Sequence, residues 1–179
     1  KSRDRSYSIH LIFSAVQFFK LIIIMSSPTY SKLHEKLGEG TISFTVGTTI
    51  KKDVQTVWEH VCKAELVVKY FPTGAKGDLD KGGEVLWSWG DEGAIINVLE
   101  VYPNEKLVFE WNAYKAEYKV TAEFIFEDMK SYTRLKIKEK GWYNDEQGIK
   151  SALANNGGWT EFVNALKIFL EHNIAFLKS

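Results

Sequence analysis

The sequence predicts an α+β domain in which one long helix covers one antiparallel sheet. Segments between Glu84 and Lys140 alternate apolar with polar residues and are joined by short connections, which favours antiparallel neighbours. Apolar residues then recur at steps of three and four from Trp159 to Leu177, the period of an amphipathic helix. Because a sheet with one apolar face needs cover, the two features together predict a single core.

The part of the domain that precedes the main run of strands is predicted to hold one strand, two short helices and a turn region. The strand, 41–50, alternates apolar and polar residues. Asp53 is placed to cap a helix over 54–62. A second helix, over 65–70, should end before a proline, since the residue that precedes proline disfavours helical backbone. The glycine-rich stretch 73–83 should form turns.

Five neighbouring strands and a final helical region complete the predicted domain. The strands are expected at 84–89, 94–101, 106–112, 117–127 and 132–140. The final region is expected to contain a helical turn over 145–154, a weak point at 155–158 where two glycines adjoin two asparagines, and then the long helix.

The composition excludes several classes of protein. Basic and acidic residues number 23 each, so there is no excess positive charge to neutralise nucleic-acid phosphates. The single cysteine, Cys62, rules out an internal disulfide, suits a reducing compartment such as the cytoplasm and is expected to be an inert buried thiol. His34, His60 and His172 lack the spacing of a metal site. With no nucleophile or phosphate-loop motif either, we predict no metal, cofactor or catalytic residue.

The sequence divides into 1–24, a lead-in over 25–40 and the domain at 41–179. Residues 1–24 contain four basic residues and one acidic residue, a net charge of +3, so the remaining residues have a net charge of −3. We interpret Met25 as the natural start and 1–24 as a non-native extension, with a targeting segment or a natural interaction helix as alternatives. The apolar stretch in this extension is interrupted by polar residues and is too short to span a membrane. If it is ordered, it should dock on its own domain or on a second copy, so the chain could be a monomer or a dimer.

Several short motifs stand in the order seen in the family of activator of heat-shock protein 90 ATPase homologue-like domains. They are Ile50-x3-Val54-x2-Val57-Trp58, Tyr70-Phe71-Pro72, Gly82-Gly83, Val101-x-Pro103-x3-Leu107-x-Phe109-x-Trp111, Thr133-x-Leu135 and Gly158-Trp159-x6-Leu166. The resemblance covers 41–177 and places the chain in the START/Bet v 1-like (SRPBCC) superfamily.

This resemblance implies a helix-grip fold, in which a curved antiparallel sheet wraps around a long C-terminal helix and two small helices close one end. It also implies a hydrophobic cavity between sheet and helix, and a cytoplasmic protein of the stress response. Co-chaperones that strongly stimulate the chaperone ATPase carry a further N-terminal domain, and nothing in 1–40 resembles it. The family name therefore does not by itself imply that activity.

Aromatic side chains are the main candidates for a binding site, because they make up 14% of the chain. They offer broad apolar surfaces, and tryptophan and tyrosine add one polar group each. The alternative is that they simply fill the core. The candidate cavity residues are Tyr70, Phe71, Trp87, Trp89, Trp111, Tyr118, Glu139, Trp142, Trp159 and Phe162. Of these, Trp111, Tyr118, Trp142 and Phe162 are expected to border a largely apolar pocket.

Glu139 has the same strand parity as Leu135 and Ile137, which places it on the inward face of the sheet. A buried carboxylate without a partner is costly. The strand therefore either frays to solvent before this residue, or Glu139 is a polar anchor at the mouth of the cavity.

Three functions follow from these observations. The first is a non-catalytic domain that binds a small hydrophobic molecule, which the aromatic residues and the implied fold favour. The second is a co-chaperone-type module that binds a chaperone or another protein, which the resemblance alone supports. The third is an enzyme of the cyclase or lyase type, which would need convergent polar groups in the cavity. Neither nucleic acid nor membrane is expected as a partner.

Overall fold

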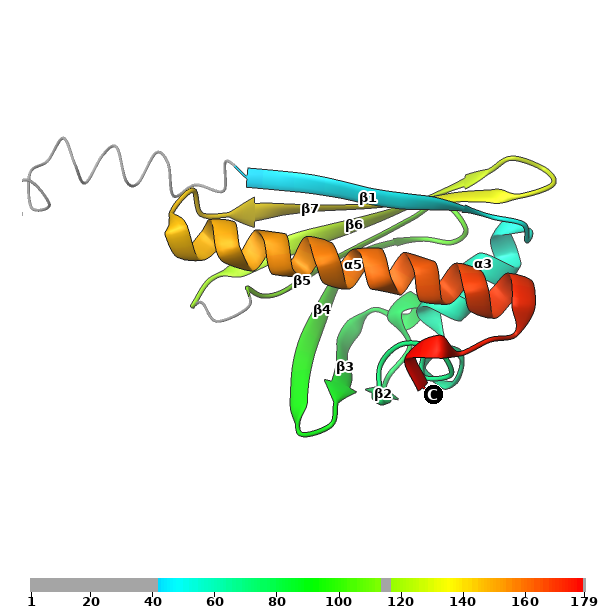
Figure 1. Cartoon of the computed structure of the whole chain (residues 1–179), viewed down its shortest axis with the longest axis horizontal. Coiled ribbons are helices and arrows are strands. Elements are labelled where there is room, and N and C mark those ends of the chain that lie inside the picture. Colours follow the sequence, from blue (N-terminus) through cyan, green and yellow to red (C-terminus); the bar gives the residue numbers. More distant parts are fainter. Residues whose placement is uncertain (1–41, 114–116, 179) are drawn as a thin grey trace, which may run out of the picture. The chain divides into compact units, whose positions relative to one another are not determined.

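The computed structural model of the chain describes residues 42–113 and 117–178, and within them seven strands form one sheet (Figure 1). The order is β1-β7-β6-β5-β4-β3-β2, and each neighbouring pair is antiparallel. The strands are β1 Ile42–Ile50, β2 Gly74–Lys76, β3 Gly83–Trp89, β4 Glu92–Tyr102, β5 Lys106–Asn112, β6 Lys119–Asp128 and β7 Thr133–Trp142. The interpretations of 1–24 and of the lead-in 25–40 lie outside the described residues.

The long helix α5, Glu146–His172, lies along one face of the sheet (Figure 1). The other helical elements are α3 Val54–Cys62, α4 Ala64–Val67, η1 Leu79–Lys81 and η2 Phe176–Lys178. The predicted α+β class is confirmed, with short helices after the first strand, a curved antiparallel sheet and a long C-terminal helix.

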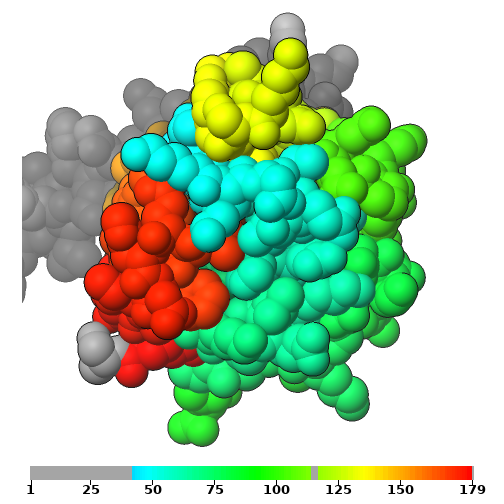
Figure 2. Space-filling model, turned by 90° about the vertical axis from the view of Figure 1, so that its right-hand side faces the viewer, coloured from blue at the N-terminus to red at the C-terminus, as the bar shows by residue number. Residues whose placement is uncertain are grey.

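One end of the domain is closed by the helices that follow the first strand. Figure 2 views this end, where the segment from α3 towards β3 packs beside the C-terminal residues. The N-terminus of α3 is capped as predicted, because the Asp53 carboxylate accepts a hydrogen bond from the Thr56 backbone N–H at 2.8 Å. One face of α3 is buried, and its residues include Trp58 and Cys62. Cys62 is thus a buried thiol, and burial raises its pKa, as expected for an inert cysteine.

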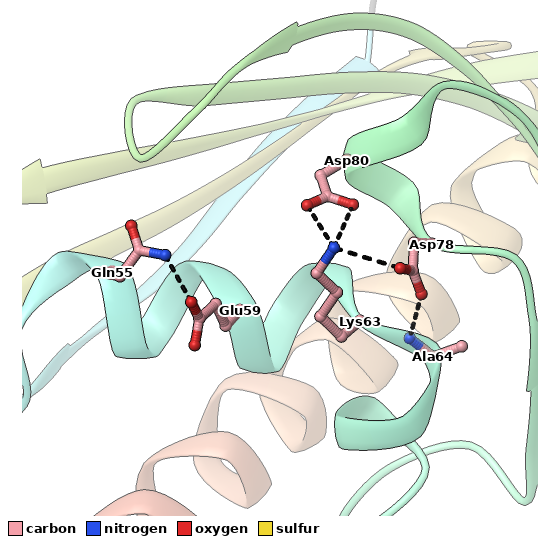
Figure 3. A network of polar contacts seen from close by, with 6 residues as sticks. All are labelled: Gln55, Glu59, Lys63, Ala64, Asp78 and Asp80. Carbon is pink, nitrogen blue, oxygen red and sulfur yellow. Dashed lines mark hydrogen bonds and ion pairs between the residues drawn. The ribbon is translucent and has the colours of Figure 1, made fainter.

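An ionic network joins these helices to the chain just before β3 (Figure 3). The Lys63 ammonium, between α3 and α4, lies 3.2 Å from the Asp78 carboxylate and 2.8 Å from that of Asp80. Asp78 also accepts a hydrogen bond from the backbone N–H of Ala64 at 3.0 Å. These contacts hold η1 against the start of α4.

The structure corrects four local expectations. The long helix ends at His172 and not at Leu177, because Asn173 adopts a left-handed conformation with φ 57°, and Leu177 lies in η2. The second helix covers only Ala64–Val67, and the chain then forms turns up to the proline. The stretch 73–83 contains a strand, β2, which pairs with β3, as well as turns. Helix α5 runs without a break through 155–158, because buried residues on both sides of the glycines anchor it to the sheet. That packing outweighs the cost of a glycine in a helix, which is about 1 kcal/mol each.

The start of α5 depends on a residue without a side chain. The Asp145 carboxylate caps the helix by accepting a hydrogen bond from the Gly148 backbone N–H at 2.7 Å. A Cβ atom at Gly148 would lie 2.0 Å from the carbonyl oxygen of Tyr143. Only glycine fits there without a backbone shift, and this fixes where the helix leaves the last strand.

Candidate functional site

A cavity of about 510 Å³ lies between the middle of α5, the start of β4 and the end of β5. Its walls come from these three elements, from the end of β3 and from the segment after α4. The lining residues are Phe71, Trp89, Glu92, Gly93, Ala94, Ile95, Trp111, Asn112, Ala113, Asn155, Gly158 and Trp159. Most of these described residues are apolar, and no Lys or Arg is among them.

Aromatic rings form two walls of the cavity. The indoles of Trp111 on β5 and Trp159 on α5 are stacked, with ring centroids 5.2 Å apart and an interplanar angle of 26°. Phe71 and Trp89 meet edge to face, with centroids 5.7 Å apart. Phe71 also packs at 5.0 Å on Phe162, which ties this wall to the core. Sheet and helix thus each contribute an aromatic ring to the cavity.

Glu139 lies on β7, between β1 and β6, so the expectation that the strand frays to solvent is wrong. It pairs with Phe44 on β1 and with Ala122 on β6, and it is fully buried. Strand β7 continues past it because Gly141, at φ 103°, forms a bulge opposite the step between Ile42 and Ser43. Glycine tolerates that backbone conformation, and pairing resumes at the end of the strand.

The Glu139 carboxylate accepts hydrogen bonds from two side chains of the cavity wall. The Trp111 Nε1–H donates at 2.9 Å and the Asn155 Nδ2–H donates at 3.2 Å. Glu139 itself does not line the cavity. It lies behind the wall and holds the polar edges of two wall residues.

Two further indole N–H groups surround this carboxylate. The Nε1 atoms of Trp142 and Trp159 are buried and make no hydrogen bond of normal geometry within the described residues. Both lie close enough to lower the pKa of Glu139, as do Trp111 and Asn155. Burial is nevertheless the largest effect, and it raises the pKa of the carboxyl above its ordinary value. No lysine or arginine forms an ion pair with Glu139 in the described part of the chain.

Four of the ten candidate residues line this cavity, namely Phe71, Trp89, Trp111 and Trp159. Among the four residues expected to border a pocket, only Trp111 does so here. Phe162 lies less than one turn after Trp159, and it packs into the main core against Tyr70 and Trp87 instead. Whether any candidate binds a ligand stays a prediction.

The remaining two candidates belong to a second, smaller cluster. Trp142 is buried with Ala113, Val120 and Ala152, and Tyr118 packs at its margin. The Tyr118 ring stacks on Tyr143 with centroids 4.0 Å apart. Its hydroxyl accepts a hydrogen bond from the Tyr143 backbone N–H at 3.3 Å. This cluster packs the end of β7 against the first turns of α5.

Sequence reasoning missed the polar and small residues of the wall, above all Asn155 and Gly158. Both stand in the stretch interpreted as a weak point in the helix. Asn155 precedes Trp159 by four residues, so a continuous helix places both on one face. A Cβ atom at Gly158 would meet nothing within 4 Å, so this glycine leaves room in the cavity.

Two further properties bear on the kind of site. Within 42–113 and 117–178, no three His, Cys, Asp or Glu side chains group as metal ligands. The same residues contain no helix both long and apolar enough to cross a membrane.

A sheet that curves around a long C-terminal helix, with a cavity between them, defines a helix-grip domain. Residues 52–171 match the model of the family described as Activator of Hsp90 ATPase homolog 1-like protein, and the chain belongs to this family. Membership supports a ligand-binding domain. No curated protein matches the chain.

Solved structures show the same fold at low sequence identity. A protein from Staphylococcus saprophyticus is 21% identical, with a TM-score of 0.64 over 75% of this chain and 95% of its own. A protein from Mesorhizobium loti is 17% identical, with a TM-score of 0.65 over 74% and 99%. The Aha1 dimer from Colwellia psychrerythraea is 14% identical, with a TM-score of 0.61 over 74% and 98%.

Proposed function

We propose that the protein is a non-catalytic binding domain that holds a small, neutral, hydrophobic molecule in the cavity between sheet and α5. The stacked pair Trp111 and Trp159 carries this proposal, because it brings an aromatic ring from each layer of the fold to the cavity. Aromatic lining suits apolar molecules. The volume of about 510 Å³ beside these rings is large enough for a small molecule.

The polar groups near the cavity support binding rather than catalysis. The buried carboxylate of Glu139 is occupied by hydrogen bonds from two wall residues. The ionisable lining residue Glu92 is exposed, so it lacks the buried environment that would tune it for proton transfer.

The test uses N-phenyl-1-naphthylamine, a neutral probe whose fluorescence rises in apolar surroundings. Gly158→Leu places a side chain in the cavity, whereas Gly157→Leu is a matched control on the exposed side of the same helix turn. Both changes replace a helix glycine, so each should raise helix propensity by about 1 kcal/mol.

We expect the wild-type chain and Gly157→Leu to bind the probe equally well. Gly158→Leu should bind at least about ten-fold more weakly, since burial of one apolar ring contributes on the order of 1.5–3 kcal/mol. Equal binding by Gly158→Leu and wild type would place the probe elsewhere on the molecule. A surface function, as in an interaction module, would then be the better explanation.

A further inference from the structure

Asn155 is a hydrogen-bonding side chain of the cavity wall whose orientation is set from behind. Its amide nitrogen lies 3.2 Å from one oxygen of Glu139 and 3.5 Å from the other. An ionised carboxylate only accepts hydrogen bonds, so it must attract the NH₂ group of the amide and not its oxygen. The carbonyl oxygen of Asn155 therefore points away from Glu139.

That oxygen has no donor among the described residues. Both contacts between the Asn155 side chain and Glu139 involve the amide nitrogen. The indole N–H of Trp111 is bonded to Glu139, and that of Trp159 is buried and lies beside the same carboxylate. The two tryptophans consequently turn their polar edges to Glu139 and leave apolar ring surface for the cavity. Asn155 Oδ1 remains as an acceptor.

We infer that the cavity selects a neutral, flat aromatic molecule that carries one hydroxyl or N–H donor, which Asn155 Oδ1 accepts. In this inference, which rests on the proposed function, Glu139 is a positioning residue that keeps the amide turned the right way. An anionic ligand fits poorly, since no Lys or Arg is among the lining residues that the structure describes. A cationic ligand gains no ion pair from Glu139, which lies behind the wall with its oxygens already bonded. The lining carboxylate of Glu92 is exposed to solvent, where an ion pair contributes little.

The test compares 2-naphthol with 2-methoxynaphthalene, which has nearly the same shape but no donor. Calorimetric titration of the wild-type chain should give about five-fold tighter binding of 2-naphthol, the contribution of one neutral hydrogen bond. Asn155→Leu should abolish this preference and leave the affinity for 2-methoxynaphthalene within about two-fold. Asn155→Ala serves the same purpose if the leucine variant does not fold.

Glu139→Gln tests the positioning role. A glutamine amide can both donate and accept, so it would also bind the oxygen of Asn155 and allow the amide to turn. The preference for 2-naphthol should then fall at least about two-fold, while 2-methoxynaphthalene binds as before. Glu123→Gln is the control, because Glu123 lies on the neighbouring strand opposite Lys138, on the other face of the sheet.

The outcomes separate this inference from the proposed function. Equal binding of the two naphthalenes by wild type, or a preference that survives at Asn155→Leu, overturns the inference alone. A protein that binds N-phenyl-1-naphthylamine but neither naphthalene also overturns the inference alone. An unchanged preference in Glu139→Gln refutes the positioning role. A protein that binds none of the three compounds overturns the proposed function and the inference together.

Discussion

Replacement of Glu139 by glutamine should change how stability depends on pH. The Glu139 carboxyl is fully buried, and burial raises its pKa above the ordinary value of 4.5, although four neighbouring N–H donors oppose that shift. Over the pH range between the ordinary and the raised pKa, the folded chain holds a proton that the unfolded chain has released. Glutamine cannot titrate, so the variant lacks this proton.

The sign follows from proton binding. Because the pKa is raised in the folded state, the stability that this group contributes is present below the unfolded pKa and is lost as pH rises through the folded pKa. The limiting slope for one proton is about 1.4 kcal/mol per pH unit. The free energy of unfolding of wild type minus that of Glu139→Gln should therefore fall as pH rises from about 4.5, and it should level off above the folded pKa.

Urea unfolding, followed by tryptophan fluorescence from about pH 4 to pH 8, measures this difference. Carboxyls with lowered pKa, such as Glu110 and Glu127, are present in both proteins and cancel. Glu123→Gln should run parallel to wild type. A difference that is constant, or that grows with pH, would refute the reasoning, because the N–H donors would then balance or outweigh burial.

The remaining predictions concern the supports of the site. Asp78→Ala should lower the free energy of unfolding by about 1–2 kcal/mol, since Ala64 N–H and Lys63 lose their partner, whereas Asp78→Asn should recover part of it. Gly148→Ala should cost on the order of 1–3 kcal/mol because its Cβ meets the Tyr143 carbonyl, while Gly157→Ala, in open space, should stabilise α5 by about 1 kcal/mol. Urea titrations check both sets, and a stabilised Gly148→Ala or an unaffected Asp78→Ala would contradict the contacts described.

Alternation and helical period predicted most of the fold because burial on one face decides both patterns. The strand parity shared with Leu135 and Ile137 correctly predicts that Glu139 faces inward. The same pattern does not predict that β7 continues past Glu139, because that depends on a bulge at Gly141 in the pairing with β1. The break expected at 155–158 failed for a similar reason, since contacts with distant strands hold that part of α5.

The sequence predicts an aromatic-lined cavity between sheet and helix, but it does not predict which residues line it. Inward-facing aromatic residues look alike in sequence, whether they fill a core, as Phe162 does, or line a space, as Trp159 does. The distinction depends on where α5 crosses the sheet and on the absence of a side chain at Gly158. Neither feature can be predicted from the periodic pattern of apolar residues.

The most direct test of the proposed binding function follows the six tryptophan indole N–H signals by NMR while N-phenyl-1-naphthylamine is added. If the probe enters the cavity, the signals of Trp89, Trp111 and Trp159 should shift most, since these residues line it. The signal of Trp58, which packs on Phe126 away from the lining, should stay in place. Shifts that are absent from the three cavity tryptophans, or largest at Trp58, would contradict the proposal that this cavity binds the ligand.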